Sequence, residues 1–193
     1  MKLERVVLEV AGGCNYFCAM CPQTSPGRGK DWTRKMHLSQ FEDILDQITP
    51  KYGTPQINLE GSGEPTLAKD LDKYIAAVKK RGLKAYMYTN AFRLEGDYMK
   101  RVVDAGIDFI RCSVIGYNPE KYRHWMDVDN FHKVRQNVIE LQDYISNSSS
   151  SAEVSSYHLI TDNGRVDYEV GQYQSNFIQQ TGTKAYIWKM HNW

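Results

Sequence analysis

Three cysteines stand close together near the start of the chain, in the run Gly-Cys-Asn-Tyr-Phe-Cys-Ala-Met-Cys-Pro of residues 13–22. Cys14, Cys18 and Cys21 are separated by three and then two residues, and they follow directly on a short apolar run at residues 6–10. This order predicts a loop at the end of a buried strand in which three thiolates converge on one point. Soft sulfur ligands select zinc or iron–sulfur clusters. Because an iron–sulfur cube normally takes four cysteines, three of them leave one metal corner open for chemistry.

A second candidate motif, Gly-Ser-Gly-Glu-Pro at residues 61–65, follows the second predicted strand. Glycines that leave a strand allow the backbone to approach a ligand closely. The amides and carbonyls of such a loop can then meet the amino and carboxylate groups of an amino-acid-like cofactor. A plain turn between a strand and a helix is the alternative interpretation, and the cysteine triplet upstream favours the ligand-binding one.

The cysteine triplet resembles the cluster-binding motif of the radical S-adenosylmethionine (radical SAM) enzymes. The resemblance implies that Cys14, Cys18 and Cys21 hold three irons of a [4Fe-4S] cluster, while the methionyl amine and carboxylate of SAM chelate the fourth. It also implies an electron donor such as flavodoxin or ferredoxin. Reductive cleavage of SAM would give methionine and a 5′-deoxyadenosyl radical, which abstracts hydrogen from a substrate. Met20 stands where the family often has an aromatic residue, and it keeps an apolar contact for the adenine.

Residues 61–65 are similar to the Gly-Gly-Glu motif of the same family, with Ser62 as the middle residue between Gly61 and Gly63. The resemblance implies that backbone groups of Ser62 and Gly63, with Glu64 nearby, hold the methionyl amine of SAM. Four further positions match the family by their place on the strands, and they form the rest of the implied SAM site: Asn90, Ser113, Thr161 and Asn163.

Each of these four positions has an implied role. Ser113 matches the position of a polar contact to the SAM ribose, whereas Thr161 and Asn163 fall where residues of the fifth strand approach the adenosine. Asn90 belongs to a Thr-Asn-Gly run common in the family, and Ala91 replaces its glycine here.

Arg111 lies on the same predicted face of the fourth strand as Phe109 and Ser113, because side chains alternate along a strand. It is expected to face the carboxylate of SAM or the substrate, and a structural ion pair is the alternative, since a buried cation needs a partner or water. The sequence identifies no general base. His37, His124 and Tyr16 are conceivable, but such residues in loops are more often ordinary surface.

Other classes of protein compete with this interpretation. The three cysteines together with His37 could form a structural zinc site of the Cys₃His type, although zinc ligands usually come as two separated pairs. A zinc or iron–sulfur module without catalysis would have no need of residues 61–64. A barrel enzyme without a cluster would leave the cysteine triplet unexplained.

The composition indicates one domain, spanning residues 1–193, because 41% hydrophobic content in 193 residues can form a sizeable core. A net charge of +1 shows no general basic excess, so composition favours neither nucleic acid nor an anionic membrane as a partner. No apolar run approaches the length of a transmembrane helix. Glu4 and Arg5 interrupt the region where a signal peptide would be apolar, so a cytoplasmic protein is expected. Cys112 is predicted to be a buried apolar side chain.

The chain repeats one unit, a short strand followed by a polar loop, an amphipathic helix and a glycine. The first helix is predicted to start at a capping box from Ser39 to Glu42 and to stop at Pro50 and Gly53. The predicted strands span residues 6–10, 56–60, 84–88, 108–114, 154–160 and 184–189, and the later helices cover 67–78, 98–103, 119–144 with a break near Asp127, and 168–180. Helices of this length between strands indicate parallel pairing with right-handed crossovers. The predicted fold is therefore an α/β, partial TIM-like (β/α)6 barrel that is open on one side, and the family resemblance implies the same architecture.

The end of the chain resembles the junction at which radical SAM proteins of the SPASM group enter a cysteine-rich C-terminal domain. His-Asn-Trp at residues 191–193 follows the last predicted strand, and a SPASM-like domain beyond it is expected to cover the open side of the barrel. Many members of that group modify peptides or proteins. The alternative is a small family member whose substrate covers the barrel mouth. Modification of a nucleoside or RNA and synthesis of a cofactor use the same core, so the sequence leaves the substrate open.

Overall fold

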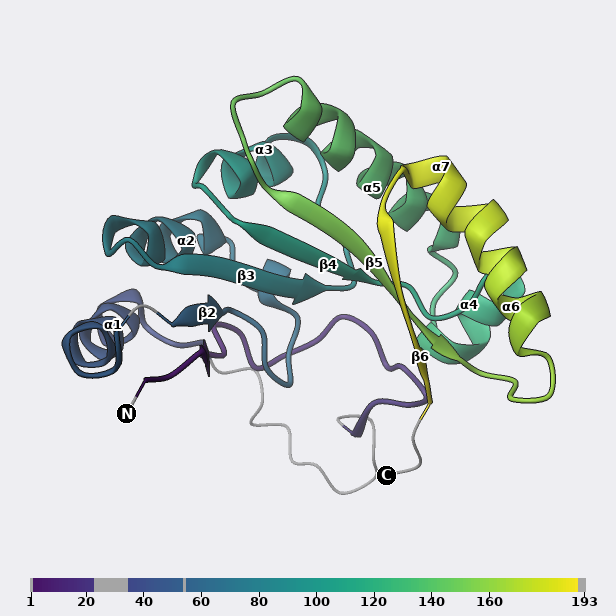
Figure 1. Ribbon diagram of the computed structural model, residues 1–193, viewed down its shortest axis with the longest axis horizontal. Helices are drawn as coiled ribbons and strands as arrows, with labels where there is room; N and C mark the ends of the chain where they lie inside the picture. The colour runs from purple at the N-terminus through teal and green to yellow at the C-terminus, as the bar shows by residue number, and fades with distance from the viewer. Residues whose placement is uncertain (1, 23–34, 54, 191–193) are drawn as a thin grey trace.

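Six parallel strands form a single sheet, in which each strand pairs with its neighbours in chain order. The computed structural model describes residues 2–22, 35–53 and 55–190. The strands are β1 (Arg5–Val7), β2 (Gln56–Asn58), β3 (Lys84–Thr89), β4 (Phe109–Ser113), β5 (Glu153–Ile160) and β6 (Lys184–Lys189) (Figure 1). Because β1 and β6 are the two edges, the sheet is an open partial barrel. The predicted fold class is confirmed.

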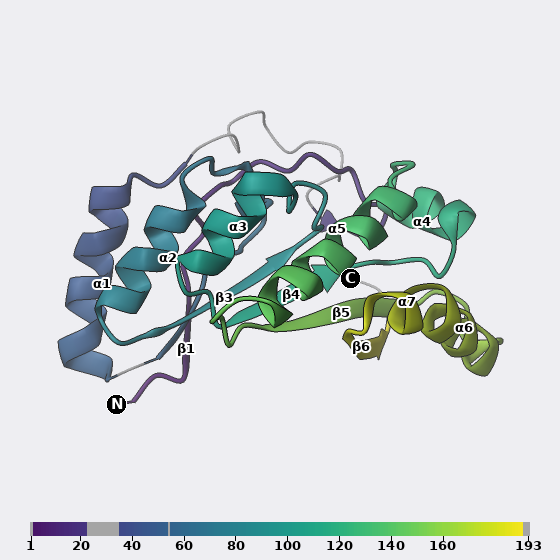
Figure 2. The same cartoon turned by 90° about the horizontal axis from the view of Figure 1, so that it is seen from above.

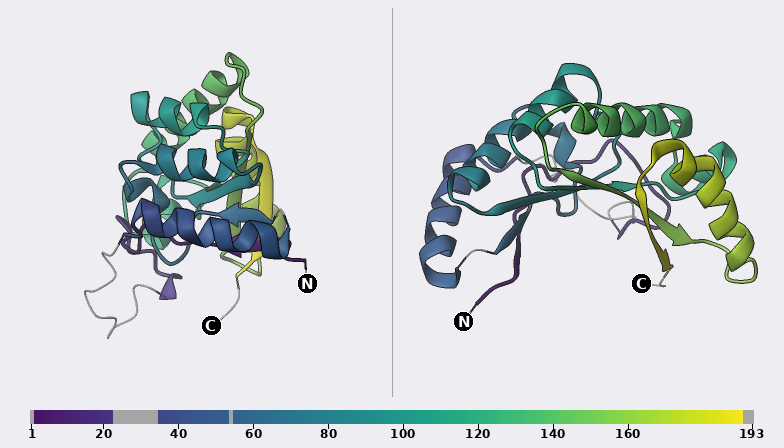
Figure 3. Two further views of the ribbon diagram at one scale, coloured as in Figure 1. Left: turned by 90° about the vertical axis from the view of Figure 1, so that its left-hand side faces the viewer. Right: turned by 45° about the horizontal axis from the view of Figure 1, so that its top comes forward.

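The helices cover one face of the sheet. They are α1 (Leu38–Tyr52), α2 (Leu71–Lys80), α3 (Gly96–Asp104), α4 (Pro119–Met126), α5 (Phe131–Ser146), α6 (Val166–Tyr173) and α7 (Gln179–Thr181). Helices α1, α2, α3 and α5 contact one another in turn and lie side by side (Figure 2). The sheet arches beneath them, so its other face is concave (Figure 3). No helix among the described residues is long and apolar enough to cross a membrane.

The core lies between the sheet and the helices. In β3, Ala85 and Met87 are fully buried, whereas Tyr86 and Tyr88 on the opposite face are half-buried. The same alternation in β4 places Cys112 at 0% exposure, which confirms its predicted role as a buried apolar side chain. Each large apolar side chain buried in this way stabilises the fold by about 2 kcal/mol.

The first two strands are shorter than predicted. β1 ends at Val7 and β2 at Asn58, although the amide of Leu8 still donates to the carbonyl of Asn58 at 2.8 Å. Val10 and Leu59 are both fully buried, so the apolar pattern of these two segments predicted their burial correctly. The chain leaves the ladder early because the segments after both strands turn toward each other and form the site described below.

The predicted capping box of the first helix is wrong. α1 begins at Leu38 with His37 at the N-cap and no side-chain cap bond, so Ser39 already lies inside the first turn, where it cannot cap. Pro50 does not stop the helix either. It lacks only one amide donor in the last turn, and the helix continues to Tyr52 before Gly53 takes a left-handed φ of 82°.

Other helix boundaries also differ from the pattern. The segment after residue 64 forms a short 3₁₀ turn, Pro65–Leu67, before α2 starts at Leu71. The predicted break at Asp127 is confirmed, because this residue adopts a φ of 57° between α4 and α5. The last helical region contains a π-helical turn, Gln174–Ile178. The junction predicted at residues 191–193 lies outside the described residues.

Candidate functional site

The cysteine loop after β1 is fixed against α4. The amide of Ala19 donates to the carbonyl of Trp125 at 2.9 Å, and the thiol of Cys18 lies 3.8 Å from the sulfur of Met126. Tyr16 is 2% exposed, and its hydroxyl accepts from Tyr122 at 3.3 Å. The loop is therefore positioned by packing between distant parts of the chain, which the local sequence does not reveal.

The three cysteines of this loop lie within electrostatic reach of one another. Burial, together with the charges of Cys14 and Cys21, raises the pKa of Cys18 to about 12. Burial also raises the pKa of Cys14, which the amide of Tyr16, 3.4 Å from its sulfur, partly offsets. Each thiolate thus disfavours deprotonation of the other two cysteines unless a cation is bound among them. A cationic metal cluster with soft ligands fits this donor set.

The zinc alternative finds no support in the geometry. Within the described residues, which include His37, no three His, Cys, Asp or Glu side chains are placed to hold one metal ion. Three cysteines that ligate separate irons of one cluster do not need to converge on a single atom. The arrangement therefore suits a multi-iron cluster better than the Cys₃His site.

The loop at residues 61–64 crosses the cysteine loop backbone to backbone. The amide of Glu64 donates to the carbonyl of Gly13 at 2.7 Å. A Cβ atom at Gly63 would lie 2.0 Å from the carbonyl oxygen of Ala11 and 2.7 Å from that of Gly13. A contact this short is impossible, so Gly63 is needed where two chain segments cross. The sequence interpretation assigned the close approach of this glycine to a ligand, and the structure shows in addition a close approach to the cysteine loop.

Glu9 is a site residue that the sequence interpretation missed. Its carboxylate accepts hydrogen bonds from the backbone amides of Ser62 and Gly63, the latter at 2.8 Å. The side chain of Glu9 also lies beside Gly61, where a Cβ atom would be 2.6 Å from Oε1. The signal that could have found it is an acidic residue within the apolar run at residues 6–10. Its contacts explain why β1 ends early.

Glu64 is buried in protein contacts and does not face open space. It is 3% exposed, and one carboxylate oxygen accepts from the hydroxyls of Thr66 at 2.6 Å and Thr89 at 2.5 Å. The other accepts from the amide of Asn90 at 2.8 Å. Burial raises the pKa of Glu64, and these hydrogen bonds oppose the shift. The carboxylate joins the ends of β2 and β3, so it positions the loop.

Asn90 connects β3 to the cysteine loop. Its side-chain amide donates to Oδ1 of Asn15 at 2.9 Å, and its own oxygen accepts from the amide of Phe92 at 3.1 Å. Ala91 adopts a φ of 59°, which explains why the family favours glycine there. The left-handed conformation costs a non-glycine residue about 1 kcal/mol.

The geometry thus brings Cys14, Cys18 and Cys21 together with the 61–64 loop at the ends of the first strands. Residues 8–158 of the chain match the model of the radical SAM superfamily. The chain belongs to the radical SAM superfamily. Membership implies a [4Fe-4S] cluster and SAM as cofactors, and the three thiols and the crossed loops fit them.

Relatives of known activity and structure agree with this assignment. The radical SAM chain is 32% identical over 141 residues to the GTP 3′,8-cyclase of Campylobacter curvus, an alignment that covers 69% of this chain and 42% of that protein. It therefore spans less than half the length of this curated relative.

Two solved structures share the fold. Streptococcus suis SuiB bound to S-adenosylmethionine has a TM-score of 0.75 at 13% identity, covering 100% of this chain and 42% of that one. SuiB was also solved with its precursor peptide SuiA. Methylornithine synthase (PylB) has a TM-score of 0.69 at 10% identity, covering 98% of this chain and 54% of that one.

The remaining implied SAM contacts of the radical SAM chain lie at three places. Met20 is partly buried against the core beside the cysteine loop, and Ser113 ends β4 on the concave face. Thr161 and Asn163 line a separate pocket of about 430 Å³ beside α4. The hydroxyl of Thr161 donates to Glu169 at 2.7 Å, so its side chain is already occupied.

Glu169 organises the end of β5. This buried carboxylate accepts from the amide of Thr161 at 3.0 Å and lies 3.0 Å from Nε2 of His158. The ring of His158 stacks on Tyr173 at 4.5 Å and its Nδ1 lies 3.2 Å from the amide of Gly116. Sequence patterns did not reveal this network, since its members are distant along the chain.

The three conceivable bases are dispersed. Burial raises the pKa of Tyr16 to about 12, which leaves it protonated and unsuited to proton abstraction. His124 lines the pocket of Thr161, and His37 caps α1.

Proposed function

We propose that this chain is the radical-forming core of an enzyme that acts on a small anionic molecule, a nucleotide or another cofactor precursor. The substrate would lie on the concave face of the sheet. The observation that carries this choice is Arg111 on that face, which lies beside tyrosine rings and has a buried Nε without a partner. The other charges that line the same hollow balance, with Lys2, Arg5 and Lys84 against Glu4, Asp108 and Glu153. Cationic side chains beside aromatic rings suit a charged ligand with a planar group.

The residues of the chain and the bound SAM would have separate roles. Cys14, Cys18 and Cys21 would hold the cluster, and the bound cluster and SAM together supply the 5′-deoxyadenosyl radical. The methionyl amine is a hydrogen-bond donor, so it needs acceptors rather than amides. The carboxylate of Glu9 and the carbonyl groups of residues 61–63 are the acceptors that this chain offers at the crossing. Glu64 would act indirectly by holding the loop.

The sequence relatives favour a nucleotide-like substrate over a peptide. The Campylobacter curvus protein is named for a reaction of GTP, whose phosphates match the guanidinium of Arg111 in the hollow. The likeness to SuiB is one of fold at 13% identity and does not extend to its peptide. A reductant such as flavodoxin or ferredoxin would deliver the electron.

Anaerobic reconstitution with iron and sulfide, followed by reduction in the presence of SAM, tests the core of the proposal. We expect the visible absorbance of a cluster and formation of 5′-deoxyadenosine. A cluster that never cleaves SAM would instead indicate a non-catalytic module.

The substrate class needs a second experiment. The reduced enzyme is incubated with nucleoside triphosphates, with uncharged nucleosides and with unrelated peptides, and the rate of 5′-deoxyadenosine formation is compared. Stimulation by a triphosphate and not by its nucleoside supports the proposal. Stimulation by a peptide alone contradicts it.

A further inference from the structure

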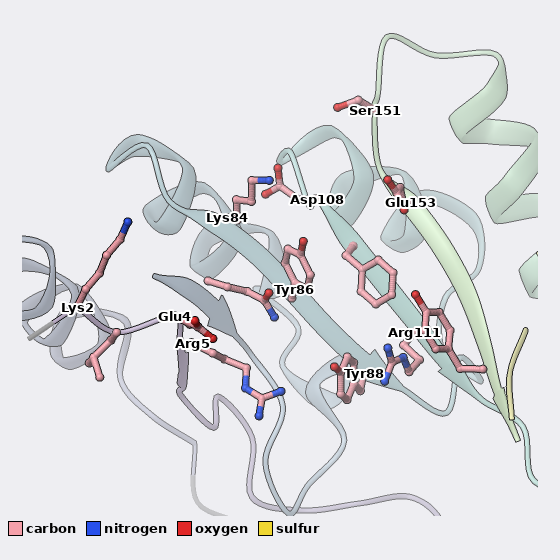
Figure 4. Close-up of a pocket in the computed structure, with 14 residues that line it drawn as sticks. Lys2, Glu4, Arg5, Lys84, Tyr86, Tyr88, Asp108, Arg111, Ser151 and Glu153 are labelled. Atoms are coloured by element: carbon pink, nitrogen blue, oxygen red, sulfur yellow. The ribbon is translucent and has the colours of Figure 1, made fainter. Parts of the chain in front are cut away.

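The concave face of the sheet holds a hollow of about 970 Å³. Its walls come from the N-terminal segment and from strands β2 to β6. Figure 4 shows Tyr86, Tyr88 and Arg111 projecting from the same face of β3 and β4 into this space. Volumes of this order accommodate a metabolite of the size of a nucleotide.

Arg111 lies among four aromatic rings in this hollow. Its guanidinium carbon is 4.5 Å from the ring centre of Tyr88 and 4.3 Å from that of Tyr186. Phe109 and Tyr157 are farther, at 5.5 and 6.0 Å. Ring faces attract a cation, but they provide no strong acceptor for its five N–H groups. The rings hold the guanidinium in place and leave its hydrogen-bonding capacity unused.

No carboxylate among the described residues accepts a hydrogen bond from the guanidinium of Arg111. Arg111 forms no ion pair or hydrogen bond within the described part of the chain, and its Nε atom is buried without a partner. The acidic side chains of the hollow are Glu4, Asp108 and Glu153. Asp108 lies 2.6 Å from Lys79 and Glu153 lies 3.8 Å from Lys184, and none of the three forms an ion pair with Arg111 in the described part of the chain. A buried donor that lacks an acceptor is energetically unfavourable. A structural ion pair, the alternative expected for Arg111, is therefore absent from the described residues.

The position of Arg111 along β4 relates the hollow to the cofactor site. Ser113 lies two residues further on the same face, about 7 Å closer to the carboxyl end of the strand. The cysteine loop follows β1, and it is linked to β3, the strand beside β4, through the hydrogen bond from Asn90 to Asn15. A ligand whose charged group sits on Arg111 can thus extend its remaining atoms toward the place where hydrogen abstraction would occur.

We propose that Arg111 binds an anionic group of the substrate, a phosphate or a carboxylate, and so sets which end of the molecule faces the radical. This inference rests on the proposed function and names the residue that recognises its substrate class. The planar guanidinium matches both anions through paired hydrogen bonds. Tyr88 and Tyr186 hold the guanidinium of Arg111 in its orientation before the ligand binds.

The test is titration calorimetry of the reconstituted chain with two probes, inorganic pyrophosphate and malonate. The wild type is compared with Arg111→Gln, Arg111→Lys and Arg101→Gln. Arg101 is on α3, outside the hollow, so Arg101→Gln removes the same charge without changing the lining of the hollow. We expect at least tenfold weaker binding in Arg111→Gln, partial recovery in Arg111→Lys, and wild-type binding in Arg101→Gln. The probe that binds more tightly identifies phosphate or carboxylate as the preferred group.

Two results overturn the inference: wild-type protein that binds neither probe, or equal binding by wild type and Arg111→Gln. If Arg111→Gln does not fold, as judged by circular dichroism, Arg111→Lys alone decides. Lysine keeps the positive charge but lacks the planar guanidinium and its paired N–H groups. Unchanged binding by Arg111→Lys therefore also contradicts the proposal. Formation of 5′-deoxyadenosine by the wild type is measured separately, so failure of the radical-forming role is distinguishable from failure of the anion site.

Discussion

The backbone nitrogen of Glu64 lies 2.7 Å from the carbonyl oxygen of Gly13, the residue that precedes the first cysteine. This single hydrogen bond joins the two motifs that carry the resemblance to radical SAM enzymes. Because Gly63 packs directly on the backbone of residues 11–13, the cofactor loop also supports the cluster loop. A substitution in the cofactor loop is therefore expected to disturb the cluster loop as well.

Gly63→Ala should remove the cluster together with SAM binding. The new methyl group would lie 2.0 Å from a backbone oxygen, and the cysteine loop must move to admit it. Iron content and visible absorbance after reconstitution measure the loss. Gly171→Ala is the matched control, since its Cβ atom meets nothing within 4 Å and alanine favours the helix by about 1 kcal/mol. A Gly63→Ala protein with full cluster content and weak SAM affinity would show that the glycine serves the ligand.

Single Cys→Ala changes at Cys14, Cys18 and Cys21 should each abolish cluster absorbance and SAM cleavage, because a cube held by two ligands is poorly retained. Cys112→Ala should keep both, at a stability cost of about 1 kcal/mol for the lost buried volume. Iron analysis and a chemical denaturation curve check the two expectations. Any one of the three variants that keeps its cluster removes that cysteine from the ligand set.

The sequence predicted those features of the fold that depend on local pattern. Short β-branched or aromatic runs located all six strands, helical spacing located the helices between them, and the break at Asp127 was predicted from the chain itself. The capping box failed because Ser39 and Glu42 match the pattern, while packing starts α1 at Leu38. Local rules cannot report which of two adjacent starts the tertiary contacts select.

The sequence indicated the candidate ligands of the site, but it did not indicate the residues that support them. The cysteine spacing is a local motif, so it could be read directly. Glu9 and Glu169 act on segments far along the chain or across a turn, and no spacing rule indicates such contacts. Glu64 was recognised as part of a motif, but only its burial reveals that it positions the loop.

Glu9→Ala should destabilise the protein by about 1–2 kcal/mol, because the amides of Ser62 and Gly63 lose a charged acceptor. Part exposure of the loop keeps the effect at the lower end of that range. Glu9→Gln retains an acceptor oxygen and should cost less than half as much. Urea denaturation compares the variants. If Glu9 also accepts from the amine of SAM, both variants bind SAM more weakly in calorimetry. Equal stability of all three proteins would contradict the role of Glu9 at the crossing.

His158 should make the stability of the protein depend on pH. Burial lowers the pKa of His158 below its ordinary value of 6.5, although Glu169 acts in the opposite direction. The unfolded chain then binds the proton more readily than the folded one, so stability is present above about pH 6.5 and falls as the pH drops toward the folded pKa. Removing this group should flatten the slope by up to about 1.4 kcal/mol per pH unit.

The measurement is the free energy of unfolding between neutral and mildly acidic pH for wild type, His158→Gln and His132→Gln. His132 is exposed on α5, so its variant should keep the wild-type slope. The difference in slope isolates His158 from the carboxylates that titrate in the same range. A His158→Gln protein with the full wild-type slope would mean that the protonation of His158 is not coupled to folding. The role of His158 at the end of β5 would then lie in its stacking on Tyr173 and its contacts with Glu169 and Gly116.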